Sequence, residues 1–472
     1  MAGYTTVVPL RNLHRYSGAS DRSQGTDLTD GPTPRHSLLS GRYKQSYAYL
    51  TLRSRMPGVM QQVVKQLSAD GPMLQQKYGE EVQKDIRQIV EAVERLKMDL
   101  NRDRTFQVFR GNEPDKNEWN AFLTELPFPK RCYFRACWLH AECYLYRRLY
   151  SFFENSRFLT GYDCFFHLKR DDMLACEPAI KILLRATHGL AGDFESFRKL
   201  LVFNLWSNRF GQQVSSYEFK ETENPEDIDV LVQVAQFDRQ LLVDDSWLLW
   251  KCLNRSRVND QELIVDFISD NAGFELFTDF LFLVFLVENK IADQVRLHVK
   301  AIPWYISDTT TLDVEWTVNY LLHHGNEFIS GFGRKVERLM SAKKIIIAPI
   351  SHFWTGPQPY FAMVELDFDL YRLLTTARVA IFKGDLHYRK LLGDFIWDTT
   401  EEFITCLRGF RPTNICAIRT VKCEVLCGLP EGKVDALHRR DHRWVFGGSY
   451  GLIQYTDSLK CCCGLELKTR FS

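Results

Sequence analysis

The feature that most constrains the fold is a repeated alternation in the second half of the chain. After about residue 226, short runs of β-branched and aromatic residues are each followed by polar residues and then by a helical pattern. Strands that alternate with helices predict a mostly parallel sheet with helices on both faces. We therefore expect an α/β/α sandwich whose strands are Leu263 to Ile268, Val295 to Ile302, Ile345 to Ile347, Val379 to Phe382 and Ile415 to Ile418.

The first half of the chain has a helical pattern instead. Apolar residues recur at spacings of three and four between Val82 and Leu100, which gives one stripe along a helix. Residues 1–42 are rich in Ser, Thr, Gly, Pro and Arg and show no periodicity, which predicts a disordered tail. We therefore expect that tail (1–42), a helical N-terminal domain (43–225) and an α/β domain that carries the functional site (226–472).

The composition excludes several classes of function. Sixty basic residues stand against fifty-nine acidic ones, so no basic excess indicates a nucleic acid partner. The most apolar run, Leu281 to Val287, is too short to span a bilayer, and residues 1–20 lack the apolar core of a signal peptide. We expect no membrane partner and a cytoplasmic or also nuclear protein. The thirteen cysteines lack the spacing of a disulfide framework or a zinc site, which predicts reduced thiols.

Polar side chains follow two of the expected strands. Asp270 and Asn271 come directly after the first strand, and Asp308 follows the second. In parallel sheets, ligands bind beyond the carboxyl ends of the strands. An Asp, Asn and Asp set offers only oxygen ligands, which suits Mg²⁺, Mn²⁺ or another divalent first-row ion. The alternative for Asp270 and Asn271 is that one of them only caps the helix that begins near Phe274.

Two further strand ends carry charged residues. Lys383-Gly384-Asp385 leads into a helix that contains Arg389, and Arg419-Thr420-Val421-Lys422 follows the last expected strand. Arg389 could bind a phosphate or sugar oxygen, Asp385 could accept hydrogen bonds from hydroxyls, and Lys422 could neutralise charge on a phosphoryl group. As alternatives, Asp385 could be a helix cap and Arg389 a solvated surface charge. The joint position of these motifs at strand ends favours a site for a small phosphorylated molecule.

These motifs resemble a known family, the domain of unknown function 89 group or damage-control phosphatases, and in particular its acidic-residue methyltransferase-like branch. The resemblance covers nearly the whole chain after residue 42. It is carried by Ser46 to Thr51, Glu142 to Arg148, Trp206 to Asn208, Asp270-Asn271, Pro303 to Asp308, Phe353 to Thr355, Lys383 to Asp394 and Arg419 to Lys422.

The resemblance implies a helical domain packed on an α/β/α domain. It also implies a phosphatase that depends on Mn²⁺, Co²⁺ or Ni²⁺ and acts on sugar phosphates such as fructose 1-phosphate and fructose 6-phosphate. By resemblance, Asp270, Asn271 and Asp308 bind the metal. The substrate contacts implied in the same way are Asp270, Asn271, Asp385, Leu386, His387, Tyr388, Arg389 and Lys422. One departure concerns specificity, because His387 stands where the branch commonly has Asn.

Our mechanistic hypothesis is that Asp270, Asn271 and Asp308 hold the metal against a phosphate oxygen of the substrate. Lys422, helped by Arg419, would stabilise the developing charge. Glu275 lies one turn into the helix after Asp270 and could orient a water or a cofactor, or could simply complement the helix dipole.

Two other classes of function stay open. One is a protein-glutamate methyltransferase that uses S-adenosylmethionine and would have a protein substrate, which the resemblance alone implies. The Gly331-Phe-Gly333 and Gly447-Gly448 clusters do not lie where a nucleotide fingerprint belongs. The other is a non-catalytic binding module, against which the intact set of polar residues argues.

Overall fold

The computed structural model describes residues 28–216, 237–256 and 262–458. Its centre is a seven-stranded sheet in the order β1-β7-β6-β5-β2-β3-β4. Neighbouring strands from β6 to β4 all pair in parallel, while β7 runs antiparallel to β6 and β1 is parallel to β7. The strands are β1 (Leu241–Asp244), β2 (Ile264–Ile268), β3 (Gln294–His298), β4 (Ile345–Ile347), β5 (Val379–Lys383), β6 (Asn414–Thr420) and β7 (Gly451–Thr456).

The five expected strands are confirmed, and the sheet is mostly parallel as predicted. Sequence reasoning missed the two strands at one edge, β1 and β7. The second expected strand is shorter than predicted, because β3 ends at His298 and Lys300 pairs instead with Thr310 in an isolated bridge. That early end matters for the site, since it turns the chain toward Asp308.

Both faces of the sheet are buried, which explains the near-continuous apolar runs of its strands. In β5, Val379 and Ile381 pack into one hydrophobic cluster, whereas Ala380 and Phe382 pack into the other. Because successive side chains of a strand point to opposite faces, the two clusters are the two layers of a sandwich. The expected α/β/α architecture is therefore present.

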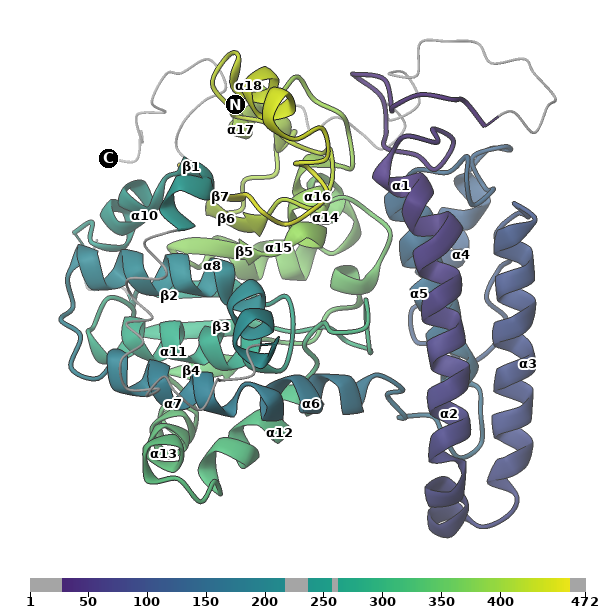
Figure 1. Cartoon of the computed structure of the whole chain (residues 1–472), viewed down its shortest axis with the longest axis horizontal. Helices are drawn as coiled ribbons and strands as arrows, with labels where there is room; N and C mark the ends of the chain where they lie inside the picture. Colours follow the sequence, from purple (N-terminus) through teal and green to yellow (C-terminus); the bar gives the residue numbers. More distant parts are fainter. Residues whose placement is uncertain (1–27, 217–236, 257–261, 459–472) are drawn as a thin grey trace, which may run out of the picture.

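The helices cover the two faces as Figure 1 shows. Members of the first layer, by their buried residues, are α6 (Phe166–Ala175), α7 (Glu177–Ala186), α8 (Phe194–Ser216), α10 (Ser246–Leu253), α11 (Phe274–Glu288), α12 (Thr311–Leu322) and α13 (Glu327–Ser341). Members of the second layer are α14 (Met363–Leu366), α15 (Phe368–Thr375), α16 (Asp385–Leu392), α17 (Phe403–Cys406) and α18 (Lys433–Arg440), with the 3₁₀ turns His352–Thr355 and Tyr360–Ala362.

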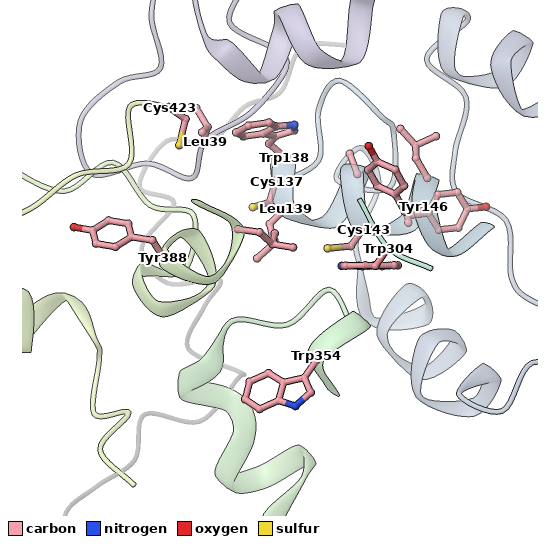
Figure 2. Packing of buried hydrophobic residues seen from close by; sticks show 14 of the residues in the cluster. Leu39, Cys137, Trp138, Leu139, Cys143, Tyr146, Trp304, Trp354, Tyr388 and Cys423 are labelled. Carbon is pink, nitrogen blue, oxygen red and sulfur yellow. The ribbon is translucent and has the colours of Figure 1, made fainter. Parts of the chain in front are cut away.

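The helical N-terminal part continues this second layer. Its helices are α1 (Tyr47–Leu50), α2 (Met56–Tyr78), α3 (Val82–Asn101), α4 (Lys116–Glu125) and α5 (Trp138–Glu154), and a π-helical turn, Thr51–Arg55, joins α1 to α2. Figure 1 shows α2 and α3 as a long pair at the edge of the molecule, away from the sheet. Figure 2 shows how Trp138, Leu139 and Tyr146 of α5 share one apolar cluster with Trp304, Trp354 and Tyr388 of the α/β part.

Two expected domain boundaries need correction. Helices α6 to α8, which we assigned to the helical domain, pack on the sheet because their apolar faces belong to the first layer. Residues 28–42, which we assigned to a disordered tail, are paired and partly buried. Leu39 is fully buried, Leu38 pairs with Phe395, and Ser40 pairs with Cys137. Residues 1–27 lie outside the described part of the chain.

The ten cysteines within the described residues are all buried, and none of them forms a disulfide. This agrees with the predicted reduced thiols, while Cys461 to Cys463 lie outside the described residues. In the part of the chain that the structure describes, we also find no helix whose length and apolar character would let it cross a membrane.

Candidate metal and phosphate site

The topology of the sheet reverses between β2 and β5. From β2 the chain proceeds to β3 and β4 on one side, and from β5 it proceeds to β6 on the other. In open α/β sheets the crevice at such a reversal, beyond the carboxyl ends of the strands, is the usual ligand site. Asp270 and Asn271 follow β2, and Asp385 begins α16 directly after β5 and Gly384. The predicted motifs therefore meet at the expected place.

Backbone hydrogen bonds bring Asp308 to the same point. Asn271 and Asp308 pair in an isolated antiparallel bridge. The N–H of Ala272 donates to Ser307 O at 2.7 Å, and the N–H of Thr309 donates to Asp270 O at 2.9 Å. This short two-stranded contact holds the backbone of Asp308 beside Asp270 and Asn271, at the crevice where we expected it.

Two glycines allow the close approach of these segments. Gly384 has a φ of +102°, and a Cβ at this residue would lie 2.2 Å from Cγ of Asp270. Gly273 has a φ of +67°, and a Cβ there would lie 2.4 Å from Oδ2 of Asp172. The same Asp172 oxygen accepts a hydrogen bond from the N–H of Phe274 at 2.9 Å, so that α6 caps the first turn of α11. The helix cap is Asp172 and is not Asp270 or Asn271.

Asp270 and Asp308 are buried carboxyl groups of like charge that lie close enough to affect each other's pKa. Burial raises the pKa of Asp270 well above its usual range, and the nearby carboxylates of Glu275 and Asp308 raise it further, against Lys422 and Lys300. Burial also raises the pKa of Asp308, although Lys300 opposes this shift. Like charges that are crowded in a desolvated site favour a cation between them.

The residues fit a divalent cation. Asp308 is buried, and its Oδ2 accepts no hydrogen bond, although Lys300 Nζ lies 3.1 Å away as an ion-pair partner. Oδ1 of Asn271 accepts from the Ser307 hydroxyl at 2.5 Å and has a second lone pair. Within the described residues, no group of three or more His, Cys, Asp and Glu side chains is arranged to hold a metal. The set here contains only two such residues, and its all-oxygen chemistry suits hard ions.

A small pocket opens beside this set. It has a volume of about 200 Å³ and lies between α6 and the first turn of α11, with Asn271, Glu275 and Ser307 in its wall. Glu275 accepts from Nδ2 of Asn271 at 3.0 Å and forms an ion pair with Lys383 at 3.2 Å. Glu275 therefore orients the Asn271 amide so that the amide oxygen faces away from it. This supports a positioning role for Glu275.

A buried ion pair connects the elements that surround the site. Lys383, at the end of β5, forms an ion pair with Asp279 of α11. Burial raises the pKa of Asp279 to about 6, against the attraction of Lys383. Asp279 also accepts from the Ser269 hydroxyl at 3.1 Å and from the Asn204 amide at 2.7 Å. Asp279 of α11 thus connects β5, α8 and the residue that follows β2.

Asp385 and Lys422 lie on the other side of the crevice. Arg419, which is fully buried, donates from Nε to Asp385 Oδ1 at 2.8 Å, and the N–H of Lys422 approaches the same oxygen at 3.3 Å. Burial raises the pKa of Asp385, but Arg419 and Arg389 outweigh it, so that the pKa lies below its usual value. Arg419 also binds the carbonyl of Cys423 at 3.2 Å. It therefore positions Asp385 and the following loop, which differs from the expected contribution to charge stabilisation.

Lys422 keeps a free ammonium group. Its Nζ makes no hydrogen bond or ion pair to any residue that the structure describes. Its charge nevertheless lowers the pKa of both Asp270 and Asp385, which places it near both. This is the arrangement that we expected for a residue that neutralises a phosphoryl group.

His387 lies behind the aspartates. It is fully buried, and its Nε2 is 2.9 Å from Lys300 Nζ, while Nδ1 contacts the Tyr360 hydroxyl. Burial and the Lys300 ammonium hold the pKa of His387 well below its usual range. The imidazole is therefore neutral and supports Lys300, which holds Asp308.

The remaining residues of the α16 motif are engaged within the protein. Leu386 is in the core, and the Tyr388 hydroxyl donates to Gln454 at 2.6 Å. Arg389 is buried, donates to Glu142 at 2.7 Å and to Asp394 at 2.8 Å, and lies over the Trp138 ring. These contacts exclude the alternative that Arg389 is a solvated surface charge. The side chain of Asn208, another residue of the resemblance, lies outside the described residues.

Sequence reasoning missed Lys300 and Ser307. Lys300 Nζ donates to Ser269 O at 2.8 Å in addition to its contacts with Asp308 and His387. A lysine at the end of an apolar strand, eight residues before the expected ligand Asp308, was the available signal. Ser307 was adjacent to that ligand.

Comparisons with known proteins found relatives that match most of the chain. The family model of the damage-control phosphatase ARMT1-like domain matches residues 51–437. The damage-control phosphatase ARMT1 of Danio rerio is 31% identical over 446 residues, which cover 90% of this chain and 98% of that protein. The proteins of the same name from Mus musculus and Homo sapiens are 32% and 31% identical, and each match covers 89% of this chain and 99% and 98% of theirs.

A solved structure was also found, a DUF89 family protein from Pyrococcus horikoshii. It aligns over 87% of this chain and 99% of its own, with a TM-score of 0.43 and 17% identity. The family match spans most of the chain, and all the motifs of the crevice lie within it. The chain therefore belongs to the ARMT1-like damage-control phosphatases.

Proposed function

We propose that this protein is a metal-dependent phosphatase of small phosphorylated metabolites, with Mn²⁺, Co²⁺, Ni²⁺ or Mg²⁺ held by Asp270, Asn271 and Asp308. The observation that carries the proposal is the crowding of two buried carboxyl groups of raised pKa, Asp270 and Asp308. Lys300, 3.1 Å from Asp308 Oδ2, is the one ion-pair partner of the two among the described residues, and a further cation would offset the remaining negative charge. The free ammonium group of Lys422 nearby supports a phosphoryl group as the ligand.

The residues of the chain divide the work as follows. Lys300 and Glu275 hold Asp308 and Asn271 in place through the contacts described above. Lys422 stabilises negative charge on the phosphoryl oxygens, since its ammonium group has no partner among the described residues. Asp385, fixed by Arg419, accepts hydrogen bonds from substrate hydroxyls. When bound, the metal supplies Lewis-acid polarisation and activates a water.

The substrates we propose are sugar phosphates such as fructose 1-phosphate and fructose 6-phosphate. Two features of the crevice support this choice. Lys422 and the proposed metal ligands suit the phosphate group, and Asp385, whose lowered pKa keeps it an acceptor at neutral pH, suits the hydroxyl groups. A carboxylate held in this way is suited to bind sugar hydroxyls.

The test is phosphate release by the metal-stripped protein, with each metal added in turn and a panel of sugar phosphates as substrates. We expect release only with added metal, and a decrease of at least about 100-fold in kcat/KM for Asp270→Ala. Asp369→Ala is the matched control, because Asp369 is exposed on α15. Release by the stripped protein, or equal activity of both variants, would contradict the proposal. If no metal supports release, binding of S-adenosylmethionine is the next measurement.

A further inference from the structure

A groove in the helical N-terminal part is separate from the candidate metal and phosphate site. It has a volume of about 560 Å³ and lies between α3, the segment of residues 107–113, and α5 with the two residues that follow it. Figure 1 shows α3 at the edge of the molecule, away from the sheet. The described residues that line the groove all belong to these three segments, and the motifs of the crevice lie elsewhere in the chain.

The groove runs along two helices. Near the start of α3, Asp85 accepts hydrogen bonds from the N–H groups of Arg157 and Phe158, just after α5, at 2.8 and 2.9 Å. Ala92, seven residues further along α3, also lines the groove, and so does Arg148 of α5. Because an α-helix rises about 1.5 Å per residue, the stretch from Asp85 to Ala92 is about 10 Å long. The groove is therefore long enough for a short, extended molecule.

Two buried carboxyl groups lie at the same end of this groove. Asp85 is 8% exposed and Glu113 is 5% exposed. Oε1 of Glu113 accepts from Nδ2 of Asn155 at 2.9 Å, and Asn155 lies two residues before Arg157, whose N–H binds Asp85. Both carboxylates are therefore held by the same short segment, residues 155–158.

Neither carboxyl group has a cationic partner. Within the described residues, no lysine, arginine or histidine forms an ion pair with Asp85 or Glu113. The guanidinium group of Arg157 pairs with Glu81 instead. Oε2 of Glu113 is buried and accepts no hydrogen bond from the part of the chain that the structure describes. Since buried charges in proteins are normally paired, these two carboxylates favour the binding of a positively charged group.

The two arginines that line the groove do not supply this charge. Arg148 lies over the Phe109 ring at 3.9 Å, and its Nη2 donates to the carbonyl groups of Gln107 and Val108. Arg110 is exposed, so that water solvates its charge at little cost. The buried carboxylates, and not the exposed guanidinium group, are therefore the groups that gain most from a ligand of opposite charge.

Apolar side chains line much of the remaining groove. They are Ile89 and Ala92 of α3, Val108 of the connecting segment, and Phe152 of α5. This surface suits a hydrocarbon chain. A bare metal ion does not fit the groove as well, because its volume is far larger than an ion and the described residues hold no group of three or more metal-ligating side chains. The ligand that matches both ends is an organic cation.

We propose that this groove is a binding site for a small alkylammonium compound, with the ammonium group bound by Glu113 and Asp85 and the hydrocarbon chain on the apolar wall. An ammonium group offers three N–H donors, which suits two neighbouring carboxylates. The inference goes beyond the phosphatase function and does not depend on it, since the groove and the crevice have no described residue in common.

The experiment compares three probes of similar size and different charge, by calorimetric titration of the full-length protein. The probes are hexylamine, which is a cation at neutral pH, hexan-1-ol, which is neutral, and hexanoate, which is an anion. We expect hexylamine to bind with a Kd of about 1–10 mM, hexan-1-ol to bind at least about 10-fold more weakly, and hexanoate to bind more weakly still. These measurements on the wild-type protein need no variant.

Variants locate the binding. Glu113→Gln keeps an acceptor for Asn155 and removes the charge, so we expect it to weaken hexylamine binding at least about 10-fold. Arg110→Gln removes a cation from the groove and should tighten binding about 2-fold at low ionic strength. Glu118→Gln is the matched control, because Glu118 is exposed and does not line the groove. Asp270→Ala changes the crevice and should bind hexylamine as the wild type does.

Each contrary outcome overturns the inference. Equal binding of hexylamine and hexan-1-ol would show that the groove is only apolar, and tighter binding of hexanoate would show that it takes an anion. The absence of saturable hexylamine binding to the wild type, or equal binding to Glu113→Gln, would remove the carboxylates from the site. Loss of binding in Asp270→Ala would place the amine in the crevice instead.

Discussion

At the scale of single residues, Gly384 decides whether Asp270 can occupy its position. A Cβ at Gly384 would meet the Asp270 carboxylate at 2.2 Å, and the φ of +102° is itself unfavourable for other residues. We expect Gly384→Ala to lower metal-dependent turnover at least about 10-fold and to destabilise the fold by about 1–3 kcal/mol. Gly409→Ala is the control, because Gly409 has a φ of +90° and no neighbour within 4 Å. Equal losses of turnover in the two variants would show that the clash with Asp270 is unimportant.

Glu424 gives the stability a pH dependence. Burial raises the pKa of Glu424 to about 7, its Oε1 accepts from the N–H of Tyr47, and its Oε2 has no partner within the described residues. Because the pKa is higher in the folded state, the folded protein binds this proton more tightly, and stability falls as pH rises from about 4.5 to about 7.

The variant Glu424→Gln removes that titration. We expect it to be about as stable as the wild type at pH 5 and more stable by about 1–2 kcal/mol at pH 8, in urea unfolding at both pH values. The direction follows because the wild-type carboxylate is ionised and incompletely hydrogen-bonded only at the higher pH. A difference between the two proteins that does not change with pH would contradict this account.

At the scale of elements, the helices and strands that could be predicted are those whose own residues carry a clear apolar pattern. The strands β2, β4, β5 and β6 follow from apolar runs that end in polar residues, and α3 follows from its stripe between Val82 and Leu100. The edge strands were not predictable in the same way. Strand β1 ends in Asp244 and β7 contains Gln454, so neither is a continuous apolar run, and β1 pairs with β7, which is far away in the sequence.

Helix α11 depends on a cap from another helix. Asp172 of α6 accepts from the first N–H of α11, that of Phe274, at 2.9 Å. We expect Asp172→Ala to destabilise the protein by about 0.5–1 kcal/mol in thermal or urea unfolding, since the orphan N–H loses its acceptor. Asp171→Ala changes the exposed neighbour on the same helix and should have no measurable effect. Identical stability of the two variants would show that the Asp172 carboxylate does not stabilise α11.

At the scale of the whole molecule, one buried cluster joins the helical part to the sheet. Arg389 of α16 binds Glu142 of α5 at 2.7 Å, and Asp394 accepts both from Arg389 and from the N–H of Leu139 at 2.7 Å. Glu142 and Arg389 are 247 residues apart in the sequence. Sequence reasoning assigned Arg389 to the substrate because nothing in the sequence shows that the distant Glu142, together with the nearby Asp394, already binds it.

Loss of one partner of this cluster should be costly. We expect Glu142→Gln to destabilise the protein by about 3 kcal/mol, because it leaves part of the charge of Arg389 buried without its counterion. Glu81→Gln breaks the exposed ion pair with Arg157, in which both side chains are 71% exposed, and should cost less than about 1 kcal/mol. Calorimetric unfolding measures both. If the two variants are equally stable, the cluster does not hold the parts together.

The candidate site shows the same division between local and distant information. Asp270, Asn271 and Asp308 were predictable because strand ends gather at one edge of a parallel sheet, and Gly384 was visible as a turn. The neutral state of His387 and the role of Lys300 depend on full burial and on contacts across the sheet, which no pattern in the sequence contains. The location of the candidate site could thus be predicted from the sequence, whereas the contacts between its side chains could not.

The measurement that tests the central claim most directly is calorimetric titration of the metal-stripped protein with Mn²⁺, compared with Asp308→Asn. This variant keeps the size of the side chain and removes the negative charge of the buried Asp308 carboxylate. We predict one Mn²⁺ site in the wild-type protein, proton release on binding, and a loss of affinity of at least about 100-fold in the variant. The absence of a Mn²⁺ site in the wild type, or equal affinity in both proteins, would contradict the account.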